Sequence, residues 1–256
     1  MLSIALLLLV QDEIVKEKDY ALDRDPAVAV RSVCGAVRVR GWDKEHARLK
    51  TTVRGRDREL IEWKIDAGKD RLEVAERWPE ERRRTIDVEI EIELQVPRSM
   101  KSLALSTVSG SVDAADVSAG TKVTTVSGSV RLARVRGDLS VSAISGAIAI
   151  EELAGARIDL TNVSGTTSVD LTPPKEGEWR LDLSAISGDV TVRLPARAGA
   201  RLKSTSLSGD LRCDFELKDA KRRDDIDRAL SGTFGDGSGA ISAQTISGSV
   251  RIEKAK

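Results

Sequence analysis

The sequence predicts an all-β protein: a β-solenoid, or single-stranded β-helix, of about eight or more stacked rungs, with an elaborated N-terminal β segment. Three observations predict this fold. A motif of the form apolar–Ser–Gly–any–apolar recurs along the chain, apolar and polar residues alternate around each copy, and aromatic residues make up only 3% of the 256 residues. A core with so few aromatics must be built from Val, Ile, Leu and Ala, which suits thin stacked strands better than a globular enzyme.

The first segment is the hydrophobic run LSIALLLLV at residues 2–10. About 20 apolar residues are needed to span a bilayer, so the run is too short for a transmembrane span. Its length fits the apolar region of a secretory signal. We therefore expect residues 1–18 to be a signal or hydrophobic segment, and the protein to be exported to the periplasm, the cell surface or the medium. The alternative is a buried first strand in a cytoplasmic protein.

Residues 19–100 are expected to form a first rung and cap-like strands. Around Gly35, five valines occupy the apolar positions of the rung motif: Val28, Val30, Val33, Val37 and Val39. Residues 86–96, IDVEIEIELQV, alternate apolar and acidic side chains without interruption, which indicates a strand with one buried face. Pro97 is expected to end that strand.

Residues 101–256 carry the repeats and are expected to form the solenoid proper. The motif glycines are spaced by 18, 18, 19, 23, 21 and 39 residues, at Gly110, Gly128, Gly146, Gly165, Gly188, Gly209 and Gly248. The last spacing is about twice the others. It contains a charged segment, residues 214–240, which we interpret as an insertion that could hold a short helix, followed by a Gly-rich loop.

Five columns of each repeat are predicted to face the core, at positions −7, −5, −2, +2 and +4 from the glycine. All but Thr121, Thr167 and Ser204 are Ala, Val, Leu, Ile or Cys. The alternation changes phase between Ala143 and Ile144, which predicts a corner there. Gly at the zero position suits close backbone approach or a positive φ. On this register, Asp at Ile144 or Ile186 would bury an unpaired charge and cost several kcal/mol.

Side chains that could carry chemistry have a structural interpretation that we prefer. The serine before each glycine could be a nucleophile, but the sole histidine, His46, lies outside the repeats, so we expect a hydroxyl ladder satisfying backbone groups at the bends. Two acid pairs share columns on consecutive motif copies and could lie about 5 Å apart: Asp159 with Asp182, and Asp189 with Asp210. Such pairs can hydrolyse glycosides or bind Ca²⁺, but nearby Lys203, Arg193 and Arg212 favour charge balancing.

Other candidates are also expected to be structural. The acidic row Asp87, Glu89, Glu91 and Glu93 could bind cations, but pairing with the strand around Arg38 and Arg40 is the simpler interpretation. The loop at residues 235–239 lacks the Lys-Ser/Thr of a phosphate loop and is expected to be a turn. Trp42, Trp63 and Trp78 are expected in the core or cap rather than as a ligand platform. We therefore predict no catalytic, cofactor-binding or metal site.

Charge and composition exclude several classes of function. The 41 basic and 41 acidic residues balance, so no overall field attracts nucleic acid. One histidine and two cysteines, Cys34 and Cys213, cannot supply a His/Cys-rich metal site. We expect no cofactor.

The repeats, the entry segment VRVRGWDKEHARL at 37–49 and the closing segment GDGSGAISAQTISGSVRI at 235–252 resemble the DUF4097 family of bacterial β-strand repeat proteins, often labelled adhesins. The resemblance covers roughly residues 25–256. It implies a β-solenoid, exported or membrane-associated, with no established catalytic residues.

Our preferred functional hypothesis is a non-catalytic exported scaffold, adhesin-like or structural, that binds an unknown protein or polysaccharide of the bacterial cell envelope. Two alternatives are kept. One is a polysaccharide-active lyase or hydrolase that uses the stacked Asp pairs. The other is a solenoid that assembles end to end into filaments through unpaired strand edges. The charged C-terminal residues and the 214–240 insertion look like caps, so we expect a monomer.

Overall fold

A computed structural model describes residues 6–10, 13–79, 86–174, 176–224 and 228–255, with the backbone alone for 6–10. It is an all-β solenoid, and in the described residues the helical content is one short 3-10 turn, Arg58–Leu60. The chain divides into two compact units, Met1–Lys122 and Val123–Lys256, which are described in turn.

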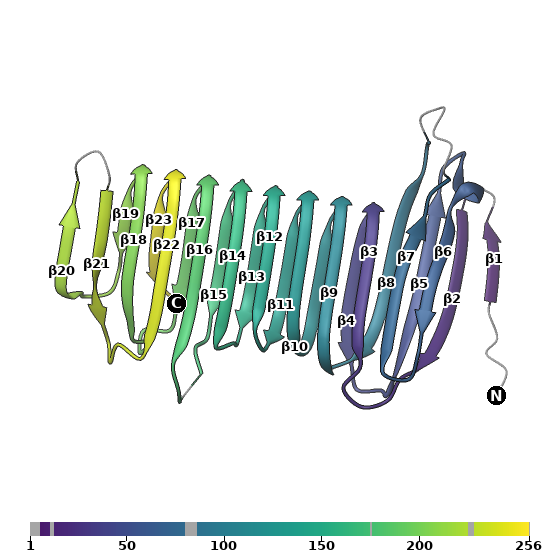
Figure 1. Cartoon of the computed structure of the whole chain (residues 1–256), viewed down its shortest axis with the longest axis horizontal. Helices are drawn as coiled ribbons and strands as arrows, with labels where there is room; N and C mark the ends of the chain where they lie inside the picture. The colour runs from purple at the N-terminus through teal and green to yellow at the C-terminus, as the bar shows by residue number, and fades with distance from the viewer. Residues whose placement is uncertain (1–5, 11–12, 80–85, 175, 225–227, 256) are drawn as a thin grey trace. The chain divides into compact units, whose positions relative to one another are not determined.

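Unit 1 is made of two strand series that enclose an aliphatic core. The strands are β1 (Leu6–Val10), β2 (Glu13–Ala21), β3 (Ala27–Cys34), β4 (Ala36–Trp42), β5 (His46–Arg54), β6 (Glu62–Ala67), β7 (Arg71–Arg77), β8 (Glu89–Pro97), β9 (Ser99–Ser109) and the first part of β10 (Val112–Ser127). One series runs β6–β7–β3–β9 and the other β1–β2–β5–β8–β4–β10 (Figure 1).

The predicted strand at 86–96 is confirmed from Glu89 onward. Ile90, Ile92, Leu94 and Val96 are at most 1% exposed, and the strand ends at Pro97. The rung predicted around Gly35 is β3 and β4. It lies between β7 and β8 on one side and β9 and β10 on the other, so the chain builds β5 to β8 before it returns past its own first rung.

Unit 2 repeats one rung plan. A strand of the first series is followed by a Ser-Gly corner and a strand of the second series. The strands are β11 (Val130–Arg136), β12 (Leu139–Ser145), β13 (Ile148–Leu153), β14 (Arg157–Ser164), β15 (Thr167–Leu171), β16 (Trp179–Ser187), β17 (Val190–Leu194), β18 (Ala200–Ser208), β19 (Leu211–Cys213), β20 (Lys218–Arg223), β21 (Arg228–Phe234), β22 (Gly239–Ser247) and β23 (Val250–Lys254). The first series of unit 2 contains β12, β14, β16, β22 and β18, and the second contains β11, β13, β15, β17, β23 and β19.

The last rung of unit 2 does not follow the order of the sequence. Strand β22 pairs in parallel with both β16 and β18, and β23 pairs with both β17 and β19 (Figure 1). Residues 214–240, where a short helix was expected, instead contain β20 and β21, which form antiparallel pairs at the outer edge of β18. The double spacing before Gly248 is therefore the length of chain needed to cap the end and return one rung inward.

The predicted core register is right in four columns and wrong in one. Around Gly146, Leu139, Val141, Ile148 and Ile150 are at most 2% exposed, as predicted, whereas Ile144 at position −2 is 52% exposed. The buried column is −3, one residue earlier: Thr125, Ala143, Asn162, Ala185, Ser206 and Thr245. The expected cost of Asp at Ile144 or Ile186 is therefore wrong, because both side chains face solvent.

The reason is the position of the corner. The chain turns at Ser145-Gly146, where Gly146 has φ +134°, and not between Ala143 and Ile144. The glycine column is close-packed along the solenoid. A Cβ on Gly146 would lie 2.2 Å from the carbonyl oxygen of Gly128, and one on Gly188 would lie 2.0 Å from that of Gly165. The prediction of positive φ and close backbone approach at these glycines is confirmed.

Candidate binding surface

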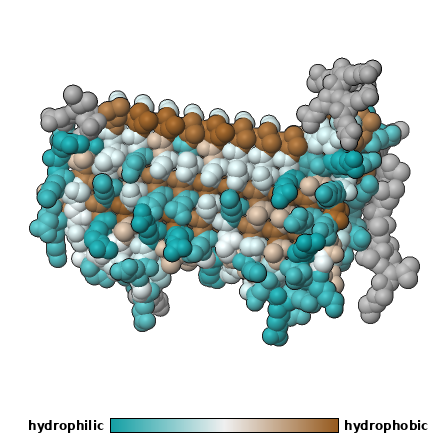
Figure 2. Space-filling model, in the orientation of Figure 1, coloured by the Kyte–Doolittle hydropathy of each residue, from teal (hydrophilic) through white to brown (hydrophobic). Residues whose placement is uncertain are grey.

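A row of exposed aliphatic side chains follows the Ser-Gly corners of unit 2. We call it the aliphatic edge, and it consists of the residues at position −2: Val126, Ile144, Val163, Ile186, Leu207 and Ile246. Five of the six are 42–52% exposed and Val163 is half-buried. Figure 2 shows the row as a continuous brown ridge. In unit 1, Val108 takes the same position in its own rung and is 49% exposed.

Strand pairing aligns this row side by side. The serines that follow the aliphatic residues are direct register partners from one strand to the next, in the spatial order Ser145, Ser164, Ser187, Ser247, Ser208. The aliphatic residues, one position earlier in each strand, share this order. Neighbouring parallel strands lie about 4.8 Å apart, so the side chains of adjacent rungs touch and form one surface.

Both rows that flank the aliphatic edge are free of charge. Position −1 is serine in every rung of unit 2, and position −4 is Thr124, Ser142, Thr161, Ser184, Thr205 or Gln244. Charged residues are 32% of the chain, so about four would be expected among these 12 positions. Charges return further out on both sides: at Lys122, Asp159, Asp182 and Lys203 beyond position −4, and at Asp189 and Asp210 beyond the glycines.

Main-chain groups, rather than serine hydroxyls, hold the corners. The amide of Gly146 donates to the carbonyl of Ser164 at 3.0 Å, and that of Gly165 donates to Ser187 at 3.0 Å. From the inner side, the side-chain amide of Asn162 donates to the carbonyl of Gly146 at 3.1 Å. The serine side chains are exposed, so main-chain groups, and not the predicted serine hydroxyls, form the ladder along the corners.

Of the two predicted acid pairs, one is adjacent in the structure and the other is not. Asp159 and Asp182 are register partners, as predicted, and Arg180 holds Asp182 through two hydrogen bonds, one of them 3.0 Å. This hydrogen bonding raises the pKa of Arg180. Lys203 does not follow Asp182 in the stack, because Ser242 lies between them.

Asp189 and Asp210 are not neighbours, which corrects the predicted separation. The last rung lies between them, and its Ser249 amide donates to Asp189 Oδ1 at 2.8 Å. Arg251 lies 3.4 Å from Asp189, and Arg228 lies 3.2 Å from Asp210. Each carboxylate is therefore engaged separately, and this pair has no shared site.

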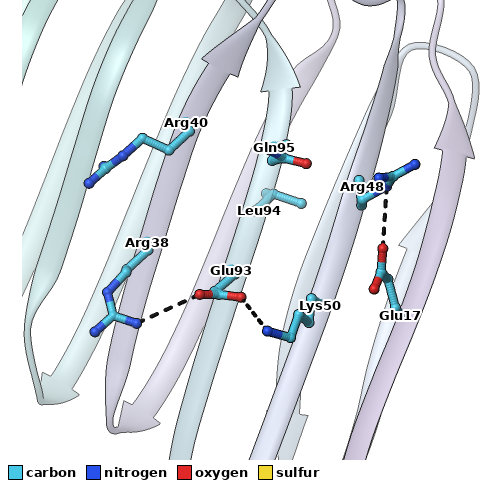
Figure 3. A pocket seen from close by; sticks show the side chains of 8 residues that line it. All are labelled: Glu17, Arg38, Arg40, Arg48, Lys50, Glu93, Leu94 and Gln95. Atoms are coloured by element: carbon cyan, nitrogen blue, oxygen red, sulfur yellow. Dashed lines mark hydrogen bonds and ion pairs between the residues drawn. The ribbon is translucent and has the colours of Figure 1, made fainter. Parts of the chain in front are cut away.

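The acidic row of β8 pairs with its basic neighbours, as predicted. Arg38 contacts Glu91 and lies 3.9 Å from Glu93, which also accepts from Lys50 at 2.9 Å (Figure 3). Arg38, Lys50 and Glu93 line a pocket of about 350 Å³ on unit 1.

The other cations of this pocket are also paired. Arg40 forms a two-pronged contact with Asp113 at 2.9 and 3.0 Å, and Arg48 reaches Asp19 at 2.8 Å. The hydrogen bond from Arg48 lowers the pKa of Asp19. Because the positive groups already have carboxylate partners, the pocket offers little attraction for an anion.

The N-terminal aromatic residues make local contacts. Trp42 Nε1 donates to the carbonyl of His46 at 2.8 Å, and the two rings meet edge to face at 4.6 Å. Trp63 and Trp78 are half-buried. The sole histidine is thus a neighbour of Trp42 in unit 1.

The remaining candidates are a turn and two thiols. In the loop at 235–239, the amide of Ser238 donates to Asp236 Oδ1 at 3.0 Å, which is turn chemistry. Cys34 and Cys213 are free thiols, and burial raises the pKa of both.

In the described residues, no three His, Cys, Asp or Glu side chains gather closely enough to hold a metal ion. Nor does this part of the chain contain a helix long and apolar enough to cross a membrane.

Comparison with known proteins gives one family and several solved structures. The family model Toastrack DUF4097 matches residues 79–253. No curated protein matches the chain. A proposed cell adhesion protein from Clostridium sporogenes is 12% identical with a TM-score of 0.44, over 94% of this chain and 100% of that one. A proposed adhesin from Bacteroides fragilis is 12% identical with a TM-score of 0.43, over 94% and 97%. A proposed lipid-binding protein from Parabacteroides distasonis is 11% identical with a TM-score of 0.35, over 94% and 97%.

Proposed function

The chain belongs to the Toastrack DUF4097 family, and from this premise we propose that it is a non-catalytic scaffold of the bacterial cell envelope whose contact surface is the aliphatic edge. The observation that carries the proposal is the row of half-exposed Val, Ile and Leu side chains with uncharged rows on both sides. Isolated exposed apolar residues are ordinary in soluble proteins, but a contiguous row marks a surface that meets another molecule.

The size of the effect supports a binding role. Covering the exposed half of one Val, Leu or Ile contributes on the order of 1 kcal/mol. Six such residues in one line can supply several kcal/mol, enough for a weak or moderate contact. A repeat that places one aliphatic residue outward in every rung gives an extended, shallow surface, as solenoids commonly do.

A catalytic role finds less support. Three of the four acids proposed for polysaccharide chemistry, Asp182, Asp189 and Asp210, are engaged by Arg180, Arg251 and Arg228, and one of the two pairs is split by a rung. None of the four acids is buried, whereas the general acid of a glycoside hydrolase is held in an apolar pocket or beside an unpaired like charge.

Export to the envelope is the second part of the proposal. It rests on the hydrophobic run at 2–10, whose length fits a secretory signal. The backbone of Leu6–Val10 forms β1, which pairs with β2 at the end of its series. Removing this segment would break no other strand pair that the structure describes, so cleavage is compatible with the fold.

Binding to envelopes tests the function. Purified protein without residues 1–10, which keeps β2 whole, is mixed with sedimented envelope fragments of its host, and bound protein is measured across a concentration series. The edge variant Ile144→Ser/Ile186→Ser/Ile246→Ser is expected to bind at least tenfold more weakly, because about 3 kcal/mol of apolar contact is removed.

The matched control carries three serines on the outer face of the second strand series: Arg131→Ser/Ala149→Ser/Thr191→Ser. It is expected to bind like the wild type, and both variants should melt within a few degrees of it. If the edge variant binds as well as the wild type, or if the wild type does not bind, the proposed function is wrong.

A further inference from the structure

We propose that the occupant of the aliphatic edge is a second copy of this chain, bound edge to edge about a two-fold axis. The inference rests on the proposed function, because it names the partner of the same surface. It differs from the expected monomer, and also from assembly through the solenoid ends.

The edge is complementary to itself in shape. Beside the ridge of Val, Ile and Leu runs a shelf of small residues, the Ser-Gly of every corner. Ile186, for example, is followed by Ser187 and Gly188, and Ile246 is followed by Ser247 and Gly248. A two-fold interface uses the same patch on both copies, so the ridge of each copy can lie on the shelf of the other.

The repeat distance matches as well. Parallel strands stack at about 4.8 Å, so a ridge and a shelf from two copies stay in step along the whole row. A partner with a different repeat distance would fall out of register with the ridge after a few rungs.

Charge permits the contact. The rows at −1 and −4 carry Ser, Thr and Gln in all rungs of unit 2, and the two acids beyond the glycines, Asp189 and Asp210, are paired with Arg251 and Arg228, so two copies can meet without bringing unpaired like charges together. A lipid surface fits less well: membrane-binding faces combine apolar residues with Lys, Arg, Trp or Tyr, and the positions of this strip contain none of these.

End-to-end stacking is disfavoured by the outermost strand. β20 is exposed along its whole length and carries Lys218, Lys221, Arg222 and Arg223. Basic side chains on an edge strand oppose the addition of any further strand to that edge. The charged end and the uncharged side together favour a lateral dimer over a filament.

The contact is expected to be weak. Six rungs give a strip roughly 25 Å long and one or two side chains wide. It buries several hundred Å² in total, below the size of standard stable interfaces, which places the dimer in the transient class.

Sedimentation velocity of the purified protein, between about 10 and 500 µM, tests the inference. The wild type is expected to shift from monomer to dimer over this range. Ile186→Arg places a charge in the middle of the contact and is expected to weaken dimerisation at least tenfold. The control Thr191→Arg, on the second strand series, is expected to dimerise like the wild type, and both variants should keep the wild-type melting temperature.

A wild type that stays monomeric at every concentration overturns the inference, as does an Ile186→Arg variant that dimerises normally. Envelopes from a strain lacking the gene separate this outcome from failure of the proposed function. If the wild type stays monomeric but binds those envelopes through the edge, the scaffold function stands and the second copy is the wrong occupant.

Discussion

Gly146→Ala is expected to lower the free energy of unfolding by more than about 4 kcal/mol, an exceptionally large effect for the addition of one methyl group. The added Cβ would lie 2.2 Å from the carbonyl oxygen and 2.7 Å from the carbonyl carbon of Gly128. Both atoms are main chain in the neighbouring rung, so neither can move aside without opening the strand pairing. The positive φ of +134° adds conformational strain for any residue with a Cβ.

Gly177→Ala is the matched control for this prediction. Gly177 also has a positive φ, +92°, but an added Cβ there meets no atom within 4 Å. Its cost is therefore conformational alone, about 1 to 2 kcal/mol. Urea unfolding of both variants measures the difference, which isolates the contact between rungs. Equal costs at the two positions would mean that the corners are not stacked as described.

Ile148→Asp is expected to cost several kcal/mol or to prevent folding, whereas Ile144→Asp should cost less than about 1 kcal/mol. The two isoleucines are four residues apart on either side of one corner. Ile148 is 1% exposed and faces the core, while Ile144 is 52% exposed and belongs to the aliphatic edge. A carboxylate at 148 would be buried without a partner, and one at 144 would be hydrated.

Thermal melting of the two variants beside the wild type tests this pair. Because the substitution is the same, charge and size effects on the unfolded chain largely cancel. If Ile144→Asp were as destabilising as Ile148→Asp, the aliphatic edge would be part of the core.

The rung plan could be predicted from the sequence because stacked rungs must repeat their inward residues in register. Hydrophobicity alone could not show that the −2 column faces solvent, since Ile144 in that column is as apolar as the buried Ile148. A signal was present in the −3 column. Ala143 keeps the alternation of Leu139 and Val141, and its counterparts are Ala, Ser, Thr and Asn, which are short enough to fit inside the corner. Giving the alternation more weight than the apolar character of Ile144 would have placed the turn at Ser-Gly.

The spatial order of the rungs could not be predicted from the sequence. Each rung carries the same inward pattern, so its residues do not reveal which rungs it will lie between. The 39-residue spacing before Gly248 indicated an insertion but not that the chain returns one rung inward. That return separates Asp189 from Asp210, so the acid pair suggested by consecutive motifs is absent from the fold.

Alkylation of single cysteines tests most directly the claim that the aliphatic edge is an exposed contact surface. In a Cys34→Ser/Cys213→Ser background, cysteines replace Ile186 in the edge, Val190 in the core and Glu151 at an exposed position of β13, and maleimide labelling rates are measured. In dilute solution Cys at 186 and 151 should react quickly and Cys at 190 far more slowly, because Val190 is 1% exposed. With host envelopes added, labelling at 186 is expected to slow at least tenfold while labelling at 151 is unchanged. Slow labelling at 186 in dilute solution, or no protection by envelopes, would contradict the claim that the edge is an exposed contact surface.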